Sequence, residues 1–485
     1  MAQDILFTDA TGLAALIRSK QLSPVEVVKA HLDRIEAVDP QVNAIVIVAE
    51  GALAAARQAE AAVMAGGELG PLHGVPFTVK DSIDTEGVPT QRGSPIFKGR
   101  VPAADATSVA RLRTAGGILL AKTNLPEFSY WIESDNLLSG RSNNPWDLDR
   151  TPGGSSGGES AAIAAGMSPL GLGTDLAISV RGPAAQTGIA ALKATHGRIP
   201  MTGIWPRAPR RFWHVGPMAR SIRDLALAFS QLAGPDGQDA FATSAVSFNA
   251  GIGAAPDRPL RIGWMVGPGF GPIDTQVVAT LRAAAEAFKG EGHFVEEVRI
   301  AALERDFALD VFNKLHVMEM KPAFREATSG HEDQMYKMAK TMLSLPDTSV
   351  EDYVAGLAGG GAAAGRLRSL LPKLRRAADP GAAGAGAQAR HHRTRRQRRS
   401  GRPHLPAGRD RTPERDGFAG AVDAVRNKPR GPAHQRATRG KLAGGDQAPL
   451  CRLGVGGHQP GPQPAPQRLK GGDLAGGHSP GPRDS

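Results

Sequence analysis

The sequence predicts an α/β fold, with helices packed around a central β-sheet. Short apolar segments bounded by Gly and Pro alternate with amphipathic segments of helical period along residues 1–360. This alternation is expected where strands and helices share one core. Near Ala358 the chain becomes dominated by Ala, Gly, Pro, Arg, His and Gln. We therefore predict a folded domain over residues 1–360 and a basic, low-complexity tail over residues 361–485.

Helices are predicted for the N-terminal part of the domain. Residues 1–65 read as helical, and the amphipathic run VEVVKAHLDRIEAV opens at a capping box, because Glu26 follows Ser23 by three positions. Pro24 stands between them at the first helical position, where its missing N–H costs nothing.

Buried strands follow these helices. Residues 74–80, GVPFTVK, combine β-branched side chains with Gly and Pro boundaries, as buried strands do. Residues 105–124 predict a helix, a Gly-Gly stop and a second buried strand, and residues 259–298 predict a strand, a helix and another strand.

The positive charge of the chain belongs to the tail. The whole chain carries +11, yet residues 361–485 hold 25 Lys and Arg against 8 Asp and Glu, which leaves 33 against 39 for residues 1–360. With so few apolar side chains to bury, the tail is expected to be largely irregular or disordered. Its composition also fits a G+C-rich gene read in a wrong frame, so a frameshift between residues 358 and 390 is the alternative hypothesis.

Several classes of protein are excluded by simple counts. Cys451 is the single cysteine, which rules out an internal disulfide and a cysteine-cluster zinc site. The N-terminus has an acid at Asp4 and lacks the layout of a secretory signal. No apolar run approaches the ~18 residues of a spanning helix. We expect a cytoplasmic protein that needs no membrane, metal or cofactor.

Three segments carry candidate chemistry, and each has a plainer interpretation. Lys80 ends a predicted buried strand, where a lysine usually extends its amine to water. Ser155 and Ser156 stand between two glycine pairs, typical of a flexible turn or of a phosphate loop. Glu159 stands where a phosphate loop would need a cation, which argues against phosphate. Ser179 lies in LGTDLAISVR (172–181), which is typical of a turn built around one serine or, more plainly, of the end of a buried strand.

Taken together, the three segments resemble the amidase signature family of serine hydrolases. The likeness lies in TPGGSSGGESAA and GTDLAISVRGPAAQTGIAALKAT, and extends upstream through GVPFTVKD and NNPWDLDRTPGG and downstream through THGRIP and GPMARSIRDLALA. It covers about residues 8–300 in the family's order. The resemblance implies a central mixed β-sheet surrounded by α-helices and a catalytic domain that is incomplete at its C-terminal end, because family members continue the fold beyond this point.

The resemblance also implies a Ser-Ser-Lys triad that works through an acyl-enzyme. Ser179 matches the nucleophile, Ser155 the bridging serine and Lys80 the base, while Ser156 supports them by hydrogen bonding. The chemistry is reasonable, because a serine hydroxyl needs an adjacent base and a buried lysine can be neutral near pH 7. Asp175 and Arg181 flank the turn and are expected to brace it.

Backbone N–H groups of the nucleophile turn are implied to form the oxyanion hole, here those of Leu176, Ala177, Ile178 and Ser179. The family usually has glycine at the positions of Ala177 and Ile178. If the turn needs a positive φ there, a β-branched residue would be strained, and its bulk would lie near the substrate carbonyl. We expect Ile178 to impair activity or to narrow the pocket.

The leading hypothesis is hydrolysis of a small-molecule carboxamide to an acid and ammonia or an amine. The alternatives are a catalytically impaired family member and the ammonia-producing component of an amidotransferase, bound to partner subunits; a homodimer is also open. Residues 128–131 and 204–213 are candidate pocket walls. The run ARHHRTRRQRRSGR (389–402) could bind nucleic acid through phosphates, but it lacks interleaved aromatic residues, so we do not expect that function.

Overall fold

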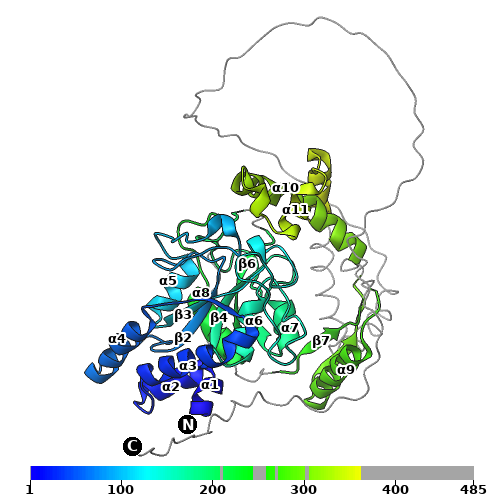
Figure 1. The fold of residues 1–485 in the computed structure, drawn as a ribbon. Helices are drawn as coiled ribbons and strands as arrows, with labels where there is room; N and C mark the ends of the chain where they lie inside the picture. Colours follow the sequence, from blue (N-terminus) through cyan, green and yellow to red (C-terminus); the bar gives the residue numbers. More distant parts are fainter. Residues whose placement is uncertain (1, 208–210, 244–257, 268–270, 301–304, 362–485) are drawn as a thin grey trace, which may run out of the picture. The chain divides into compact units, whose positions relative to one another are not determined.

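The computed structural model describes residues 2–207, 211–243, 258–267, 271–300 and 305–361 (Figure 1). Of the predicted tail, only residue 361 falls in these ranges, as the last described residue of a helix over residues 350–361. The basic run 389–402 and most of the segment to which the frameshift hypothesis applies lie outside the described residues.

A six-stranded mixed sheet forms the centre of the fold, as predicted. Its strand order is β1-β3-β2-β4-β6-β5. The strands are β1 (Ile45–Val48), β2 (Pro76–Lys80), β3 (Ile118–Thr123), β4 (Leu170–Asp175), β5 (Ala190–Ala191) and β6 (His214–Ala219). β2 runs parallel to both β3 and β4, whereas the β1–β3, β4–β6 and β5–β6 pairs are antiparallel. In Figure 1 the strands β2, β3, β4 and β6 lie among helices.

Besides the helix over residues 350–361, the helices of the described ranges lie before, between and after these strands. They are α1 (Ala2–Phe7), α2 (Ala10–Arg18), α3 (Pro24–Val42), α4 (Ala52–Ala65), α5 (Thr107–Thr114), α6 (Gly157–Ala164), α7 (Arg181–Thr187), α8 (Ile222–Leu232), α9 (Thr275–Gly290), α10 (Arg305–Thr328) and α11 (Lys337–Ser344). In the part of the chain that the structure describes, none of them is both long and apolar enough to cross a membrane.

The predicted capping box is present at the start of α3. The Ser23 hydroxyl accepts from Val25 N at 2.9 Å, and the Glu26 side chain accepts from Ser23 N at 2.9 Å. The prediction of helix throughout residues 1–65 is wrong at Ile45–Val48, which form the edge strand β1. Four consecutive β-branched side chains favour a strand over a helix here, and β3 supplies the antiparallel partner.

Two clusters of buried apolar side chains hold the helices against the sheet. The larger one joins α2, α5 and α8 to β2 through Phe77 and Val79. The second joins α3, α4 and α6 to β3 through Ile118 and Leu120. Because side chains alternate along a strand, Thr78 and Lys80 of β2 point away from Phe77 and Val79, toward α6. This alternation places the lysine on the face where the serine loop begins a helix.

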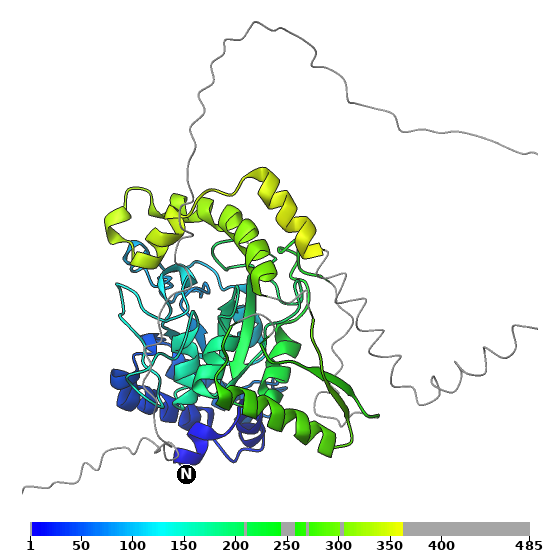
Figure 2. The same ribbon diagram turned by 90° about the vertical axis from the view of Figure 1, so that its right-hand side faces the viewer.

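The remaining predicted strand–helix–strand unit is also present. β7 (Arg261–Trp264) and β8 (Phe294–Glu297) pair in parallel as a separate two-stranded sheet, with α9 between them in the sequence. Helices α10 and α11 follow α9 in the sequence, and both views draw this part of the chain in green to yellow (Figures 1 and 2). Tyr336, just before α11, donates its N–H to Glu127 at 2.7 Å.

Candidate active site

Lys80 is buried at the end of β2, with no exposed side-chain surface. Its Nζ donates to Ser155 Oγ at 2.6 Å, to Ser156 Oγ at 3.0 Å and to Thr174 Oγ1 at 3.0 Å. Three hydroxyl acceptors therefore surround the amine. The interpretation of Lys80 as a side chain that reaches water is wrong, because its strand lies between β3 and β4.

The surroundings of Lys80 favour its neutral form. Burial lowers the pKa of Lys80 well below its usual value, and the negative charges of Asp175 and Glu159 offset only part of that shift. Hydroxyl groups can accept a hydrogen bond from the amine and also donate one to its lone pair, so they tolerate both charge states. An amine held in this way has the chemistry of a general base.

The serine loop is tightly packed, contrary to the interpretation as a flexible turn. A Cβ at Gly154 would lie 2.5 Å from Glu133 N, and one at Gly157 would lie 2.5 Å from Ser134 Oγ. Ser134 binds both sides of the loop, because its hydroxyl donates to Ser155 O at 3.3 Å and accepts from Gly157 N at 2.9 Å. The glycines thus permit close approach of two chain segments, and the loop holds Ser155 beside Lys80.

Ser156 connects the serine loop to the turn that follows β4. Its hydroxyl donates to Thr174 O at 3.2 Å and accepts from Thr174 N at 3.3 Å, while Ser156 N donates to Ser179 O at 3.1 Å. Ser179 is nearly buried, with 8% of its surface exposed. The structure thus brings Lys80, Ser155, Ser156 and the backbone of Ser179 into one place.

Asp175 and Arg181 tie together the two ends of the turn. The buried carboxylate of Asp175 accepts from Arg181 Nε and Nη2, both at 2.9 Å, and from Val180 N at 3.2 Å. Arg181 Nη2 also donates to Ala177 O at 2.7 Å. The paired side-chain bonds fix the distance between the end of β4 and the start of α7, so the turn between them has a defined shape.

A family model described as Amidase matches residues 26–364, well over half of the chain. The chain belongs to the amidase signature family. Solved structures agree with this: a 6-aminohexanoate cyclic dimer hydrolase superposes with a TM-score of 0.69 and 30% identity, covering 76% of this chain and 77% of that one. A bacterial aryl acylamidase of the family gives a TM-score of 0.68 and 27% identity over 76% of this chain and 78% of that one.

Curated relatives match a shorter part of the chain than these solved structures do. A glutamyl-tRNA(Gln) amidotransferase subunit of Acidothermus cellulolyticus is 46% identical over 238 residues, 49% of this chain and 47% of that one. Indoleacetamide hydrolase of Bradyrhizobium diazoefficiens is 40% identical over 60% of this chain and 56% of its own length. Acylamidase of Rhodococcus erythropolis is 40% identical over 61% and 62%. The chain thus spans about half to three fifths of the length of these relatives.

Ile178, in the turn before Ser179, does not adopt a left-handed backbone conformation. The described non-glycine residues with positive φ are Lys20, Asn43, Arg92, Phe128 and Ser129. Ile178 is not among them, so the expected backbone strain is absent. Its side chain is 46% exposed and lies over Gly182, where a Cβ would come within 2.8 Å of Ile178 Cγ1. Only the bulk of the side chain therefore remains as a reason for Ile178 to hinder a substrate.

Four backbone N–H groups of the turn point to no protein acceptor. Within the described ranges, the structure records no hydrogen bond from the N–H of Leu176, Ala177, Ile178 or Ser179, whereas the next N–H, that of Val180, donates to Asp175. Neighbouring N–H groups without acceptors are the arrangement that binds a developing negative charge.

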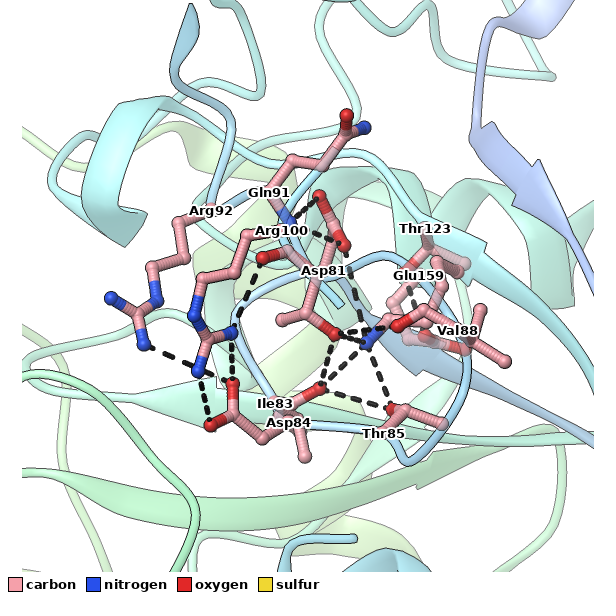
Figure 3. Close-up of polar contacts among 12 residues, drawn as sticks. Asp81, Ile83, Asp84, Thr85, Val88, Gln91, Arg92, Arg100, Thr123 and Glu159 are labelled. Carbon is pink, nitrogen blue, oxygen red and sulfur yellow. Dashed lines mark hydrogen bonds and ion pairs between the residues drawn. The ribbon is translucent and has the colours of Figure 1, made fainter. Parts of the chain in front are cut away.

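Thr174 and Glu159 are site residues that the sequence did not identify. Thr174 accepts from Lys80 Nζ, and the available signal was a hydroxyl next to Asp175 at the end of a strand that begins with Leu and Gly residues. In the sequence, Glu159 argues only against a phosphate-binding loop. It is fully buried on α6, accepts from the Thr78 hydroxyl, and accepts from Thr123 Oγ1 at 2.8 Å (Figure 3).

A second buried lysine lies on the neighbouring strand β3. Lys122 Nζ donates to Ile83 O at 2.6 Å and to Thr85 Oγ1 and Thr90 Oγ1 at 2.9 Å, and it lies 3.9 Å from Asp81. Figure 3 shows the loop that carries Asp81, Ile83 and Thr85. Each contact joins Lys122 to the segment that follows Lys80. This network therefore anchors the chain immediately after the candidate base.

The two candidate pocket walls meet in an aromatic cluster. The rings of Phe128 and Trp205 are 5.2 Å apart, and Phe324 of α10 lies 5.1 Å from Phe128 and 5.7 Å from Trp205. Phe128 is almost fully buried, so it belongs to the core as well as to its loop. Residues 208–210 of the second wall lie outside the described ranges.

Proposed function

We propose that the chain hydrolyses the C–N bond of a small carboxamide, releasing a carboxylic acid and ammonia or an amine. The observation that carries the proposal is the 2.6 Å contact between Lys80 Nζ and Ser155 Oγ in a fully buried setting. Membership of the amidase signature family supports it, as do relatives named acylamidase and indoleacetamide hydrolase.

In the proposed acylation step, Ser179 Oγ forms a bond to the amide carbon. Its proton passes through the Ser155 hydroxyl to neutral Lys80. The carbonyl oxygen becomes an oxyanion, which the N–H groups of Leu176, Ala177, Ile178 and Ser179 stabilise. Removing one such donor typically costs on the order of 10²–10³ in rate.

The tetrahedral intermediate then collapses. The C–N bond breaks, and the proton returns from Lys80 through Ser155 to the leaving nitrogen. Water attacks the acyl group on Ser179, its proton follows the same path to Lys80, and the carboxylic acid departs as Ser179 regains its proton. Ser156 and Thr174 keep the amine in place, because both accept from Lys80 Nζ.

A fluorophosphonate probe tests this proposal without knowledge of the substrate. We expect covalent labelling of the full chain at Ser179, loss of labelling in Ser179→Ala and strong reduction in Ser155→Ala. Ser168→Ala is the matched control, because Ser168 is also buried but its hydroxyl donates to Leu170 O, within its own loop. Equal labelling of wild type and Ser179→Ala would reject Ser179 as the nucleophile.

A second candidate function is that of the ammonia-producing component of an amidotransferase. The observation that favours it is the 46% identity to a glutamyl-tRNA(Gln) amidotransferase subunit. In that case the chain would release ammonia from an amide donor only within a complex with partner subunits. Affinity purification from the native host distinguishes the two functions: a stoichiometric heteromeric complex supports the second, and an active chain free of partners, whether monomer or homodimer, supports the first.

A further inference from the structure

Glu159 is a buried carboxyl group that the proposed mechanism leaves unused. It has no exposed surface and lies on the third position of α6. The Thr78 hydroxyl donates to its Oε1, and the Thr123 hydroxyl donates to its Oε2 at 2.8 Å. Because both oxygens accept hydrogen bonds, the contacts fit an ionised carboxylate.

Residues of three adjacent strands form the binding site of this carboxylate. Thr78 belongs to β2, Thr123 to β3 and Gly171 to β4, and Thr78 pairs directly with Gly171 in the sheet. A Cβ at Gly171 would overlap Glu159 Oε1. Because Gly171 has no side chain, the carboxylate of Glu159 fits against the sheet beside Thr78. Thr78 is two residues before Lys80 on β2 and on the same face of the strand.

In the part of the chain that the structure describes, no cationic side chain pairs directly with Glu159. Among the described residues, no ion pair within 4.0 Å includes Glu159, whereas Asp175 is bound by Arg181 at 2.9 Å. Lys80 and Lys122 are the cations that act on Glu159, and Asp175 and Glu159 are the anions that act on Lys80. Lys122 already has Asp81 at 3.9 Å. Lys80, in contrast, forms no ion pair within 4.0 Å inside the described ranges, and the charges that act on it are those of Asp175 and Glu159.

We propose that Glu159 is a positioning residue that stabilises the protonated form of Lys80 during acylation. The inference rests on the proposed role of Lys80 as the base. When the proton of Ser179 reaches Lys80, an ammonium ion forms where water cannot solvate it. Asp175 has the larger effect on Lys80 but is paired with Arg181, whereas Glu159 is in no ion pair among the described residues and adds a second negative charge. Without Glu159 the amine accepts the proton less readily.

The protonation of Glu159 itself sets the pH range of this effect. Burial raises the pKa of Glu159 to about 7, although the hydroxyls of Thr78 and Thr123 and the charges of Lys80 and Lys122 oppose that rise. Glu159 is therefore charged above about pH 7 and becomes neutral as the pH falls below it. Its influence on Lys80 is greatest on the alkaline side of neutrality.

The first test measures Lys80 directly and needs no activity. In the full chain labelled with ¹³C at lysine Cε, the Lys80 signal is assigned by its loss in Lys80→Met and titrated against pH. We expect Glu159→Gln, which keeps the shape and removes the charge, to lower the pKa of Lys80 by on the order of one unit. The matched control is Asp224→Asn, another buried carboxylate, which accepts from Ala10 N and Thr11 N far along the chain from Lys80. It is expected to leave the Lys80 titration unchanged.

The second test follows the rate of fluorophosphonate labelling against pH. Ser179 Oγ bonds to phosphorus as fluoride leaves, and its proton goes to Lys80. The rate rises as Lys80 loses its proton, so Glu159→Gln is expected to move that rise to lower pH by on the order of one unit and to lower the plateau severalfold. A purely structural role would lower the amount of active protein without moving the rise.

Thr123→Val provides a second variant should Glu159→Gln fail to fold, as judged by circular dichroism. It removes one donor to Glu159, which makes the carboxylate less stable, so we expect a shift of Lys80 in the same direction and of smaller size. Unchanged Lys80 titration in both variants would overturn the inference. Absence of labelling in wild type would instead reject the proposed function, and the ¹³C titration would still report on Glu159.

Discussion

Lys80 and Ser155 are joined by a 2.6 Å hydrogen bond, although 75 residues separate them in the chain and both are buried. Parallel pairing of β2 with β4 and the start of α6 beside them create this contact. The bond links a lysine whose pKa burial lowers well below its usual value to a hydroxyl that can pass a proton in either direction. The reactivity expected of Ser179 depends on this relationship and on the groups around it.

Lys80→Arg is expected to abolish labelling by a fluorophosphonate probe. Arginine stays protonated at any pH used in solution, so it cannot accept the proton of a serine. Loss of a general base typically lowers rates on the order of 10²–10⁴-fold. Lys80→Met serves as the neutral control for folding. Labelling of either variant within a few-fold of wild type would contradict the role of Lys80.

Gly171→Ala is expected to destabilise the fold by about 1–3 kcal/mol, the usual cost of an added methyl group in a packed core. The new Cβ would overlap Glu159 Oε1, and the hydroxyls of Thr78 and Thr123 keep that carboxylate from moving. Urea unfolding at pH 7.5 measures the cost. In a double-mutant cycle, Glu159→Ser should remove most of it, because a serine leaves the space free. Additive effects of the two substitutions would contradict the proposed contact.

Replacing Ile178 by Ala and by Gly should separate side-chain bulk from backbone conformation. Ile178 has no positive φ, so glycine's freedom is not required at this position. If the side chain over Gly182 obstructs the substrate, both variants should hydrolyse aryl and alkyl amides faster than wild type, and to a similar extent. A gain in the glycine variant alone would indicate that the backbone is the obstacle. Equal rates in all three chains would show that Ile178 does no harm.

The stability of the domain is expected to fall between about pH 6.5 and pH 4 because of His31. Burial lowers the pKa of His31 to about 4. Its Nδ1 bonds Val27 O at 2.8 Å, and its Nε2 has no hydrogen-bond partner among the residues that the structure describes. The unfolded chain binds a proton near pH 6.5 while the folded chain does not, so acidification favours unfolding by at most about 3 kcal/mol for this group.

His31→Met should weaken that dependence. Urea unfolding of both chains at pH 7.5 and pH 5 measures it, and the difference between the chains isolates His31 from His214, whose pKa burial also lowers to about 4. We expect the wild type to lose more stability than the variant on acidification. The same loss in both chains would show that His31 is not responsible.

Local signals in the sequence were sufficient for most of the elements. The capping box at Ser23 and Glu26 depends on neighbours within one helical turn, and the strand around Phe77 depends on apolar, β-branched residues between Gly and Pro. The predictions of a mixed sheet and of the candidates Lys80, Ser155 and Ser179 depended on resemblance to the amidase signature family, to which the chain belongs. The strand Ile45–Val48 was missed although its four β-branched residues are a local signal, and the partner β3 that makes it an edge strand lies more than 70 residues away.

The sequence by itself determined most of the order of helices and strands, apart from β1, and the candidate residues Lys80, Ser155 and Ser179. Only the tertiary structure decided what surrounds them: that Lys80 has three hydroxyl acceptors, that Ile178 avoids a left-handed backbone, and that Glu159 occupies the space left by Gly171. The physical reason is the same in each case. Burial, charge and the fit of one side chain against another depend on residues that become neighbours through strand pairing, and spacing along the chain does not specify those neighbours.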